Sequence, residues 1–272
     1  MGNKKFDEFY FENDKNYPDS IYWDSFEVDR RTTEEKYDNH MFCPLCHSAP
    51  ITVVKGAERR YFKVDKTDMS KHNPECSYKL DEANKTDTKE FYGNLDTTDI
   101  KNRLISCMNR MLKKRLGTLG MGEENAGSNK KRDVEFLNFK TKEQKKKYLL
   151  HKNLLTKFND DDLKIQKIFY GECDISVRPF KVEDEIKRYY LKIMPIGKKY
   201  KICDVSIAPS VYTYLEDILK DIPEEGVGVQ KCYICFSGLM EKKIFIIKDG
   251  SRRYSHSCIL KDSRLIVIEK SL

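Results

Sequence analysis

The spacing of apolar residues changes along the chain, from a helical period in the middle to strand-like runs towards the end. In residues 97–116 the apolar side chains recur every three or four positions, at Ile100, Leu104, Met108, Met111 and Leu112. This period predicts a helix that stops at Gly117. A second helix is predicted from Thr141, which stands at capping-box spacing from Gln144, to Phe158.

From Lys164 onward, short runs rich in β-branched and aromatic residues alternate with turn residues. The runs are KIQKIFYGECDISV, RYYLKIMPI, YKICDVSIA, VQKCYICFSGLM, KKIFIIKDGSRRYSHSCIL and RLIVIEK. Asp249–Gly250 predicts a hairpin turn, and one helix is predicted at roughly Ser210–Leu219. Five or six strands with one inserted helix predict a small, partly open barrel, of which the oligonucleotide-binding (OB) barrel is one example.

The first 80 residues combine short strands with irregularly spaced aromatic residues. Ile51–Val54 and Arg60–Val64, separated by a turn around Gly56, predict a hairpin. Before residue 40 the aromatic side chains follow neither a helical nor a strand period. We expect them to supply core, with a partner-binding surface as the alternative.

Cysteine content and apolar runs bear on the compartment. The chain has 272 residues and nine cysteines, an odd number, and it shows neither a membrane-length apolar run nor an apolar leader at its start. We therefore expect reduced thiols or metal ligands rather than disulfides, no membrane partner, and a cytoplasmic location.

Four residues have the spacing of a closed metal site. Two residues separate Cys43 from Cys46, and three separate His72 from Cys76. The first spacing lets both thiolates reach one ion from a tight turn, and the second places imidazole and thiolate on one side of a helical turn or loop. Thiolate and imidazole favour zinc, and four protein ligands leave no open position for water. We therefore predict one structural Zn²⁺ ion.

Other assignments of these residues stay open. Cys43–His47 also matches the c-type haem attachment pattern, which would leave His72 and Cys76 unexplained. His47 or His40 is an alternative fourth ligand, and a metal-free cluster is a further alternative. A second group is either another metal site or, as the alternation in KCYICFSG favours, ordinary strand cysteines: Cys232, Cys235, His256 and Cys258.

Residues 42–78 combine aromatic-Cys-Pro-x-Cys, a basic hairpin with Tyr-Phe, and His-x3-Cys-x-Tyr. In this pattern they resemble the N-terminal zinc modules of bacterial mobile-element and competence-associated proteins. The resemblance covers about 40 residues and implies a role in DNA handling or in conflict with phage.

Positive charge is concentrated in the middle of the chain. Lys and Arg number 15 against 19 Asp and Glu in residues 1–95, 16 against 7 in 96–158, and 20 against 18 in 159–272. The candidate nucleic-acid-binding residues are three basic triplets and a hairpin group: Lys113, Lys114 and Arg115; Lys130, Lys131 and Arg132; Lys145, Lys146 and Lys147; Arg59, Arg60 and Tyr61. Such clusters attract phosphates, although lysine runs also form solvated helix faces. Aromatic side chains that would stack unpaired bases are Tyr189, Tyr190, Tyr200 and Tyr233.

Together these features predict an α+β protein. Residues 1–95 form a zinc-binding module with an acidic, aromatic N-terminal segment, residues 96–162 a basic helical connector with a flexible loop at 117–132, and residues 163–272 a β-rich, barrel-like domain.

The predicted function is non-catalytic binding of nucleic acid. A protein–protein interaction or adaptor module, docking through residues 1–40, is one alternative. A metal-dependent nuclease is the other, because four residues offer carboxylates for a divalent cation and a lysine for an attacking water: Glu172, Asp174, Glu185 and Lys187.

Overall fold

The computed structural model describes residues 5–12, 15–56, 60–74, 76–94, 97–117, 137–140, 145–163, 165–246 and 252–271. Its contacts group the chain into two compact units: unit 1 comprises residues 1–83 and 112–157, and unit 2 comprises residues 84–111 and 158–272. Residues 96–162, expected as one connector, are divided between the two units. Most of the loop predicted at 117–132 lies outside the described residues. None of the described helices is long and apolar enough to span a membrane.

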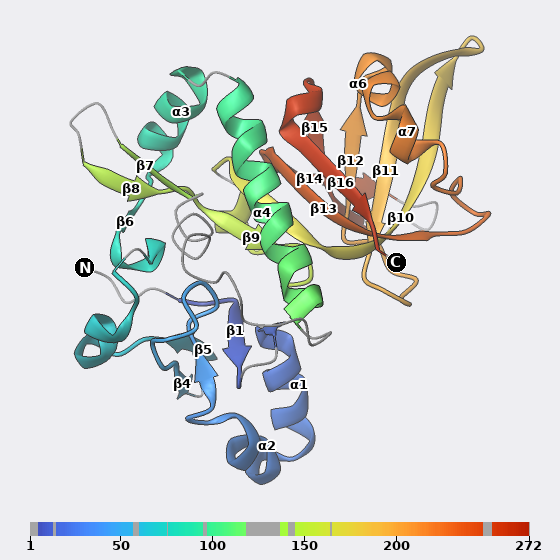
Figure 1. Cartoon of the computed structure of the whole chain (residues 1–272). Coiled ribbons are helices and arrows are strands. Elements are labelled where there is room, and N and C mark those ends of the chain that lie inside the picture. The colour runs from blue at the N-terminus through green and yellow to red at the C-terminus, as the bar shows by residue number, and fades with distance from the viewer. Residues whose placement is uncertain are drawn as a thin grey trace. The chain divides into compact units, whose positions relative to one another are not determined.

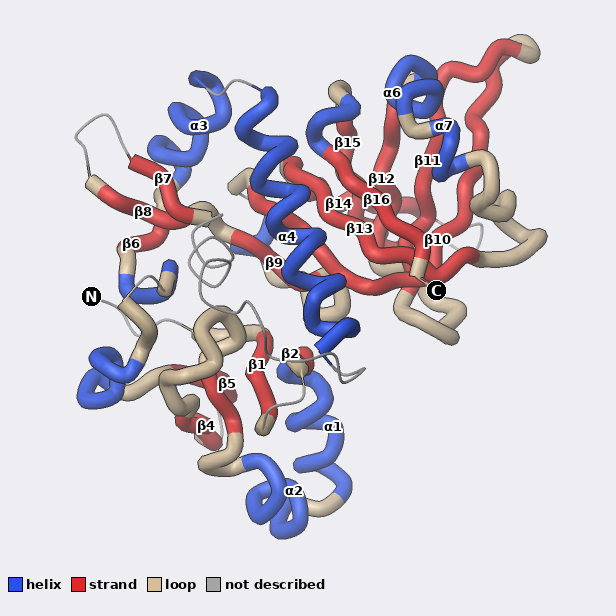
Figure 2. Tube along the Cα trace, viewed as in Figure 1, coloured by secondary structure: helices blue, strands red, loops and turns tan. Residues whose placement is uncertain are grey.

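Unit 1 is built from short elements (Figures 1 and 2). Its strands are β1 Glu8–Phe11, β2 Asn16–Pro18, β3 Met41–Phe42, β4 Thr52–Lys55, β5 Arg60–Lys63, β6 Asp81–Glu82, β7 Asn138–Lys140, β8 Lys146–Tyr148 and β9 His151–Asn153. Its helices are α1 Asp19–Val28 and α2 Arg30–Tyr37, with 3-10 turns η1 Lys66–Lys71 and η2 Ser77–Lys79. Strands β1 to β8 form the ladders β2-β1-β3, β4-β5 and β6-β8-β7. The predicted hairpin is thus confirmed as β4-β5.

The N-terminal aromatic residues supply the core of unit 1, as expected. Phe9, Tyr22 and Phe62 are fully buried, and the ring of Phe62 meets those of Phe9 and Tyr22 edge-on, each at 5.5 Å between centroids. Phe9 lies on β1, Tyr22 on α1 and Phe62 on β5. Because these aromatic residues come from a strand and a helix in quick succession, their spacing shows no single period.

The helix predicted from Thr141 to Phe158 is wrong. Residues 141–144 lie outside the described residues, and the chain beyond them forms β8 and β9. Strand β8 has one nearby and one distant partner: Tyr148 stands opposite Asn138 on β7 and opposite Glu82 on β6, and the amide of Leu149 donates to the carbonyl of Leu137 at 2.8 Å. These ladders outweigh the local helical spacing of the leucines.

Unit 2 consists of one large curled sheet and several helices. The strands are β10 Lys167–Val182, β11 Glu185–Met194, β12 Cys203–Ile207, β13 Gln230–Gly238, β14 Met240–Ile246, β15 Arg252–Leu260 and β16 Ile266–Lys270. The helices are α3 Lys85–Asn94, α4 Thr97–Gly117, α6 Pro209–Tyr214 and α7 Glu216–Leu219, with 3-10 turns η3 Asp160–Leu163 and η4 Ser263–Leu265. The last residues of α4, from Leu112, belong to unit 1. The sheet runs β14-β15-β12-β11-β10-β13-β16, and the β12–β15 pair is parallel.

One predicted helix of unit 2 is confirmed, and the other is divided into two. Helix α4 ends at Gly117, and its residues Ile100, Leu104 and Met108 are buried as the periodicity required. The region predicted at Ser210–Leu219 forms two short helices, α6 and α7.

The sheet curls back on itself without closing into a barrel. Strand β10 pairs with β13 along residues 167–175 and with β11 along residues 174–182, so it bridges two parts of the sheet. Strands β13 and β14 are joined through Leu239 alone, although β14 stands at the opposite end of the strand order, where it pairs with β15. Gly238 at the end of β13 allows a close approach to β15, because a Cβ atom there would lie 2.3 Å from Cys258 Sγ.

One face of this sheet is the core of unit 2. The strand registers align a row of five residues across β10, β11, β12, β15 and β14, and every one of them is buried: Val177, Leu191, Val205, Cys258 and Met240. Because side chains alternate along a strand, the neighbouring row points to the opposite, outer face.

Candidate metal centre and candidate nucleic-acid interface

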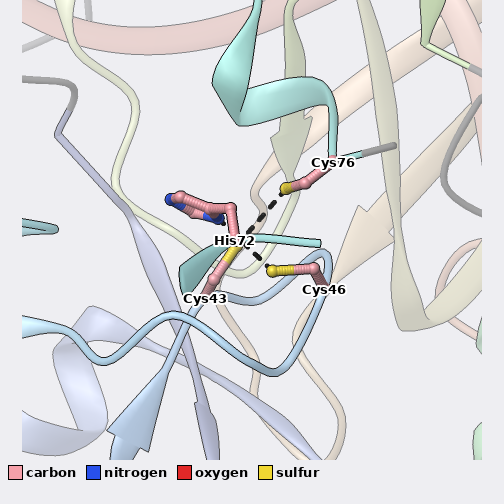
Figure 3. A group of neighbouring side chains, drawn as sticks. All are labelled: Cys43, Cys46, His72 and Cys76. Atoms are coloured by element: carbon pink, nitrogen blue, oxygen red, sulfur yellow. Dashed lines mark hydrogen bonds between the residues drawn. The ribbon is translucent and has the colours of Figure 1, made fainter. Parts of the chain in front are cut away.

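The four predicted zinc ligands come together in unit 1. Cys43 follows β3, Cys46 lies three residues later, His72 follows η1 and Cys76 precedes η2. All four side chains are buried, and their ligand atoms lie within 4.8 Å of one another. Figure 3 shows the two halves of the cluster converging from these two chain segments. This is a Cys3His group compatible with one zinc ion.

The distances inside the cluster fit a tetrahedral centre. Cys43 Sγ lies 4.0 Å from Cys76 Sγ, and Cys46 Sγ lies 3.3 Å from His72 Nδ1. Tetrahedral zinc with ordinary bond lengths sets ligand atoms about 3.5–3.8 Å apart. The other ring nitrogen, His72 Nε2, is buried and has no hydrogen-bond partner among the described residues. Nδ1 is therefore the nitrogen that faces the thiols.

Burial and mutual hydrogen bonds shift the pKa values of the three thiols in opposite directions. Burial, followed by hydrogen bonds to Cys46 and Cys76, raises the pKa of Cys43 well above its usual value. Hydrogen bonds from Cys43, then Cys76, lower the pKa of Cys46 despite burial. A hydrogen bond with Cys43 acts to lower the pKa of Cys76. The hydrogen bond with Cys46 and burial outweigh this effect and raise the pKa of Cys76 to about 12. The cluster thus holds one negative charge readily and further charges only with a compensating cation.

The turn that carries the first two cysteines is fixed by its own backbone. The amide of Cys43 donates to the carbonyl of Ala49 at 2.8 Å, and that of His47 donates to the carbonyl of Cys43 at 2.9 Å. His47 has a positive φ of 56°, and its ring stacks on Tyr10 at 3.6 Å. Asn73, next to His72, ties the two halves together, because it accepts from the Ser48 hydroxyl at 3.1 Å.

The alternative histidine ligands lie outside the cluster. His47 stacks on Tyr10, and His40 Nδ1 pairs with Glu12 at the surface. Among the described residues, the Cys43 cluster is the one metal-type grouping of histidine, cysteine or carboxylate side chains. The cysteines of the second group are buried strand residues: Cys232 and Cys235 lie on β13, and Cys258 on β15. His256 stacks on Phe158 at 4.9 Å between ring centroids.

The candidate nucleic-acid residues of the described chain all lie in unit 1, on separate elements. Arg60 pairs with Glu27 and lies over the rings of Trp23 and Phe26. Tyr61 follows it on β5 and is covered by Lys5, whose Nζ lies 5.2 Å from the ring centre. The backbone of Lys113, Lys114 and Arg115 belongs to α4, and Lys146 and Lys147 belong to β8, with Lys145 exposed just before it. Arg59 and the triplet Lys130, Lys131 and Arg132 lie outside the described residues.

The outer face of β10 and β11 carries aromatic and cationic side chains that sequence reasoning did not group. The registers place Arg178 opposite Tyr190 and Phe180 opposite Arg188. The Arg178 guanidinium lies 4.7 Å from the Tyr190 ring centre, and Phe180 meets that ring edge-on at 6.2 Å. We call Arg178, Phe180, Arg188, Tyr190 and Lys192 the β10–β11 face. The alternation of side chains along each strand is visible in the sequence, but the pairing of the two strands, which joins these residues into one face, is not.

The β10–β11 face extends along a protruding hairpin. The turn between the strands has Glu183 and Asp184 at φ values of 51° and 63°, which is the left-handed pair typical of a two-residue hairpin. Phe180 is 42% exposed, and Arg188 is exposed. Of the other tyrosines expected to stack bases, Tyr233 is buried, Tyr189 stacks on Tyr212 at 3.8 Å, and Tyr200 is exposed.

The four residues of the nuclease alternative hold structural contacts. Glu172 accepts from Ser271 Oγ at 2.7 Å and pairs with Lys231 at 3.0 Å. Asp174 is buried and accepts from the amide of Gly197 at 2.7 Å. Glu185 and Lys187 pair with each other next to the exposed hairpin turn.

No protein-family model matches the chain, and no curated protein matches it. Among solved structures, the chain is similar to the mitochondrial single-stranded DNA-binding protein Rim1 of S. cerevisiae. That match has 14% sequence identity, covers 39% of this chain and 94% of Rim1, and has a TM-score of 0.24.

Proposed function

We propose that this chain is a zinc-stabilised, non-catalytic protein that binds single-stranded nucleic acid through the β10–β11 face. The observation that carries the proposal is the ladder formed by Arg178, Tyr190 and Phe180, with Arg188 beside it. Flat rings stack on any unpaired base, and the flanking cations meet its phosphates, which is how single strands are held without sequence preference.

The connectivity of unit 2 supports the same proposal. Strands β10, β11 and β12 follow one another antiparallel, α6 and α7 intervene, β13 returns beside β10, and β15 lies parallel to β12. This order resembles that of an OB barrel, which is partly open and binds oligonucleotides on the face of its second and third strands. Strands β11 and β12 occupy the corresponding places, so the β10–β11 face shares β11 with that surface.

The zinc ion belongs to the proposal as a structural element. Cys43, Cys46, His72 and Cys76 would hold it, and the bound ion would cross-link the turn after β3 to the segment around η1 and η2. The residues fit the ion because three buried thiols need a cation to balance more than one ionised sulfur. The setting in DNA handling or phage conflict stays a prediction of the sequence resemblance.

The decisive test is a binding titration with a fluorescein-labelled oligothymidylate, followed by anisotropy at several salt concentrations. We expect Tyr190→Ala to weaken binding by about fivefold or more, since one stacked base contributes roughly 1–3 kcal/mol. Arg188→Ala should lower the slope of log K against log[salt] by about 0.7, the value of one phosphate contact on a single strand.

Matched controls lie in the same unit, away from the β10–β11 face. Tyr214 on α6 is 60% exposed, so Tyr214→Ala removes an exposed ring without touching that face. Arg264, which pairs with Asp262 at 2.7 Å, gives the charge control Arg264→Ala. If these controls weaken binding as much as Tyr190→Ala and Arg188→Ala do, the β10–β11 face is not the binding surface.

The basic triplets provide the second arm of the experiment. Replacing all three with alanine removes nine positive charges and should reduce affinity strongly if they contribute phosphate contacts. Loss of binding in the triplet variant with normal binding in Tyr190→Ala would move the interface from unit 2 to those residues. A protein that binds no oligonucleotide, even at low salt, would refute the proposed function.

A further inference from the structure

Glu225 places a carboxylate between two cations of the β10–β11 face. Its Oε2 lies 2.9 Å from Arg178 Nε, and its Oε1 lies 2.9 Å from Lys192 Nζ. Arg178 and Lys192 lie on neighbouring outer rows of the sheet, since Arg178 stands opposite Tyr190 and Lys192 opposite Ser176. The two oxygens of the Glu225 carboxylate therefore bind the Arg and the Lys in the way that a phosphate group would bind them.

The position of Glu225 is set by its backbone and not by its carboxylate. The amide of Glu225 donates to the carbonyl of Val177 at 2.9 Å, and the amide of Val177 donates to the carbonyl of Pro223 at 3.0 Å. These bonds attach the loop to β10 as a short parallel bridge. Removing the charge of Glu225 therefore leaves the loop attached.

The contact is accessible to solvent, so a ligand can compete for it. The side chains of Arg178, Lys192 and Glu225 are 46%, 25% and 33% exposed. The hydrogen bond from Lys192, opposed by burial, lowers the pKa of Glu225, so the carboxylate is ionised at neutral pH. Ion pairs at such exposure are weak enough to exchange partners.

We infer that Arg178 and Lys192 form a phosphate subsite of the β10–β11 face, and that Glu225 occupies it as an internal competitor. The inference rests on the proposed function, and its ligand is a backbone phosphate of a single-stranded nucleic acid. Binding at this subsite displaces the Glu225 carboxylate, so the protein retains strands whose other contacts are strong enough to offset that displacement.

The test compares two substitutions that change net charge equally. Glu225→Gln keeps the size of the side chain and frees both cations, whereas Glu269→Gln alters an exposed glutamate on β16. With labelled oligothymidylate, Glu225→Gln should bind at least fivefold more tightly than wild type. The magnitude of its salt slope should rise by about 0.7 for each cation that gains a phosphate. Glu269→Gln should stay within twofold of wild type.

The double variant Arg178→Ala/Glu225→Gln identifies where the gain arises. It should lose most of the added affinity if the freed guanidinium binds the phosphate. Equal affinities for Glu225→Gln and Glu269→Gln, with wild-type binding intact, would overturn this inference and leave the proposed function standing. No binding by any variant would remove the proposed function and this inference with it.

Discussion

The bend between β13 and β14 offers a quantitative test of the fold, through Gly238→Ala. The new Cβ atom would lie 2.3 Å from Cys258 Sγ and 3.3 Å from Leu260 Cδ2. Ordinary contacts of this kind need about 3.5 Å or more, so the sulfur would have to move by roughly 1 Å. Cys258 is fully buried in the central row of the core, where overpacking costs about 1–3 kcal/mol. We therefore expect Gly238→Ala to lower the free energy of unfolding of unit 2 by about 1–3 kcal/mol.

The sulfur is the obstacle, so removing it should cancel the effect. In the double variant Gly238→Ala/Cys258→Ala the nearest remaining atom is Leu260 Cδ2, a methyl carbon that needs to shift by only a few tenths of an ångström. The double variant should therefore be no more than about 1 kcal/mol less stable than Cys258→Ala alone, which makes the two substitutions strongly non-additive.

Hydrogen exchange of the β13 and β15 amides measures this loss in unit 2, and the only tryptophan provides an internal control. Trp23 lies on α1 in unit 1, so its fluorescence reports the unfolding of that unit. Gly238→Ala should accelerate exchange in β13 and β15 while the urea midpoint of the Trp23 signal stays unchanged. Additive effects of the two substitutions would show that the close approach of Gly238 to Cys258 does not exist.

Three further outcomes are expected. Chelation of zinc, or Cys76→Ser, should shift the Trp23 emission and abolish the cooperative unfolding of unit 1, as followed by fluorescence; a metal-free sample with an unchanged transition would contradict the zinc assignment. Burial, reinforced by Asp7 and opposed by Lys152, raises the pKa of Asp19 to about 6. Because the folded state retains this proton after the unfolded chain has lost it, stability falls as pH rises from about 4 to 6. Asp19→Asn should therefore exceed wild type in urea midpoint at pH 7 and equal it at pH 3.5. Finally, Asp184→Gly should raise the thermal midpoint of unit 2, since Asp184 has a φ of 63° that glycine adopts without strain; a lowered midpoint would mean that Asp184 is not strained.

The parts of the structure with a strong local signal were predictable from the sequence. The apolar residues of α4 recur at the period of a helix and of no other element. The short spacing of Cys43 and Cys46 predicts the tight turn that the backbone hydrogen bonds around them form. The strand runs after Lys164 were identified as strands because β-branched residues alternate there.

The features that the sequence did not predict depend on how separate segments of the chain pair. The leucines of residues 141–158 have helical spacing, but residues 146–149 pair with residues 81–82 and 137–140, an arrangement that this spacing does not reveal. The β10–β11 face depends on the register between two strands, and Glu225 reaches it from a loop about 30 residues further along the chain. Such groupings become visible only when the pairing of the strands is known.

The division of the chain into two discontinuous units has consequences for its synthesis. All four candidate zinc ligands leave the ribosome before residue 84, but residues 112–157, which complete unit 1, emerge only after a segment that belongs to unit 2. Metal captured early would hold a nascent unit together while it waits for the rest of its chain. The polypeptide crosses between the units at residues 83–84, 111–112 and 157–158, so a single proteolytic nick cannot release either of them as a whole.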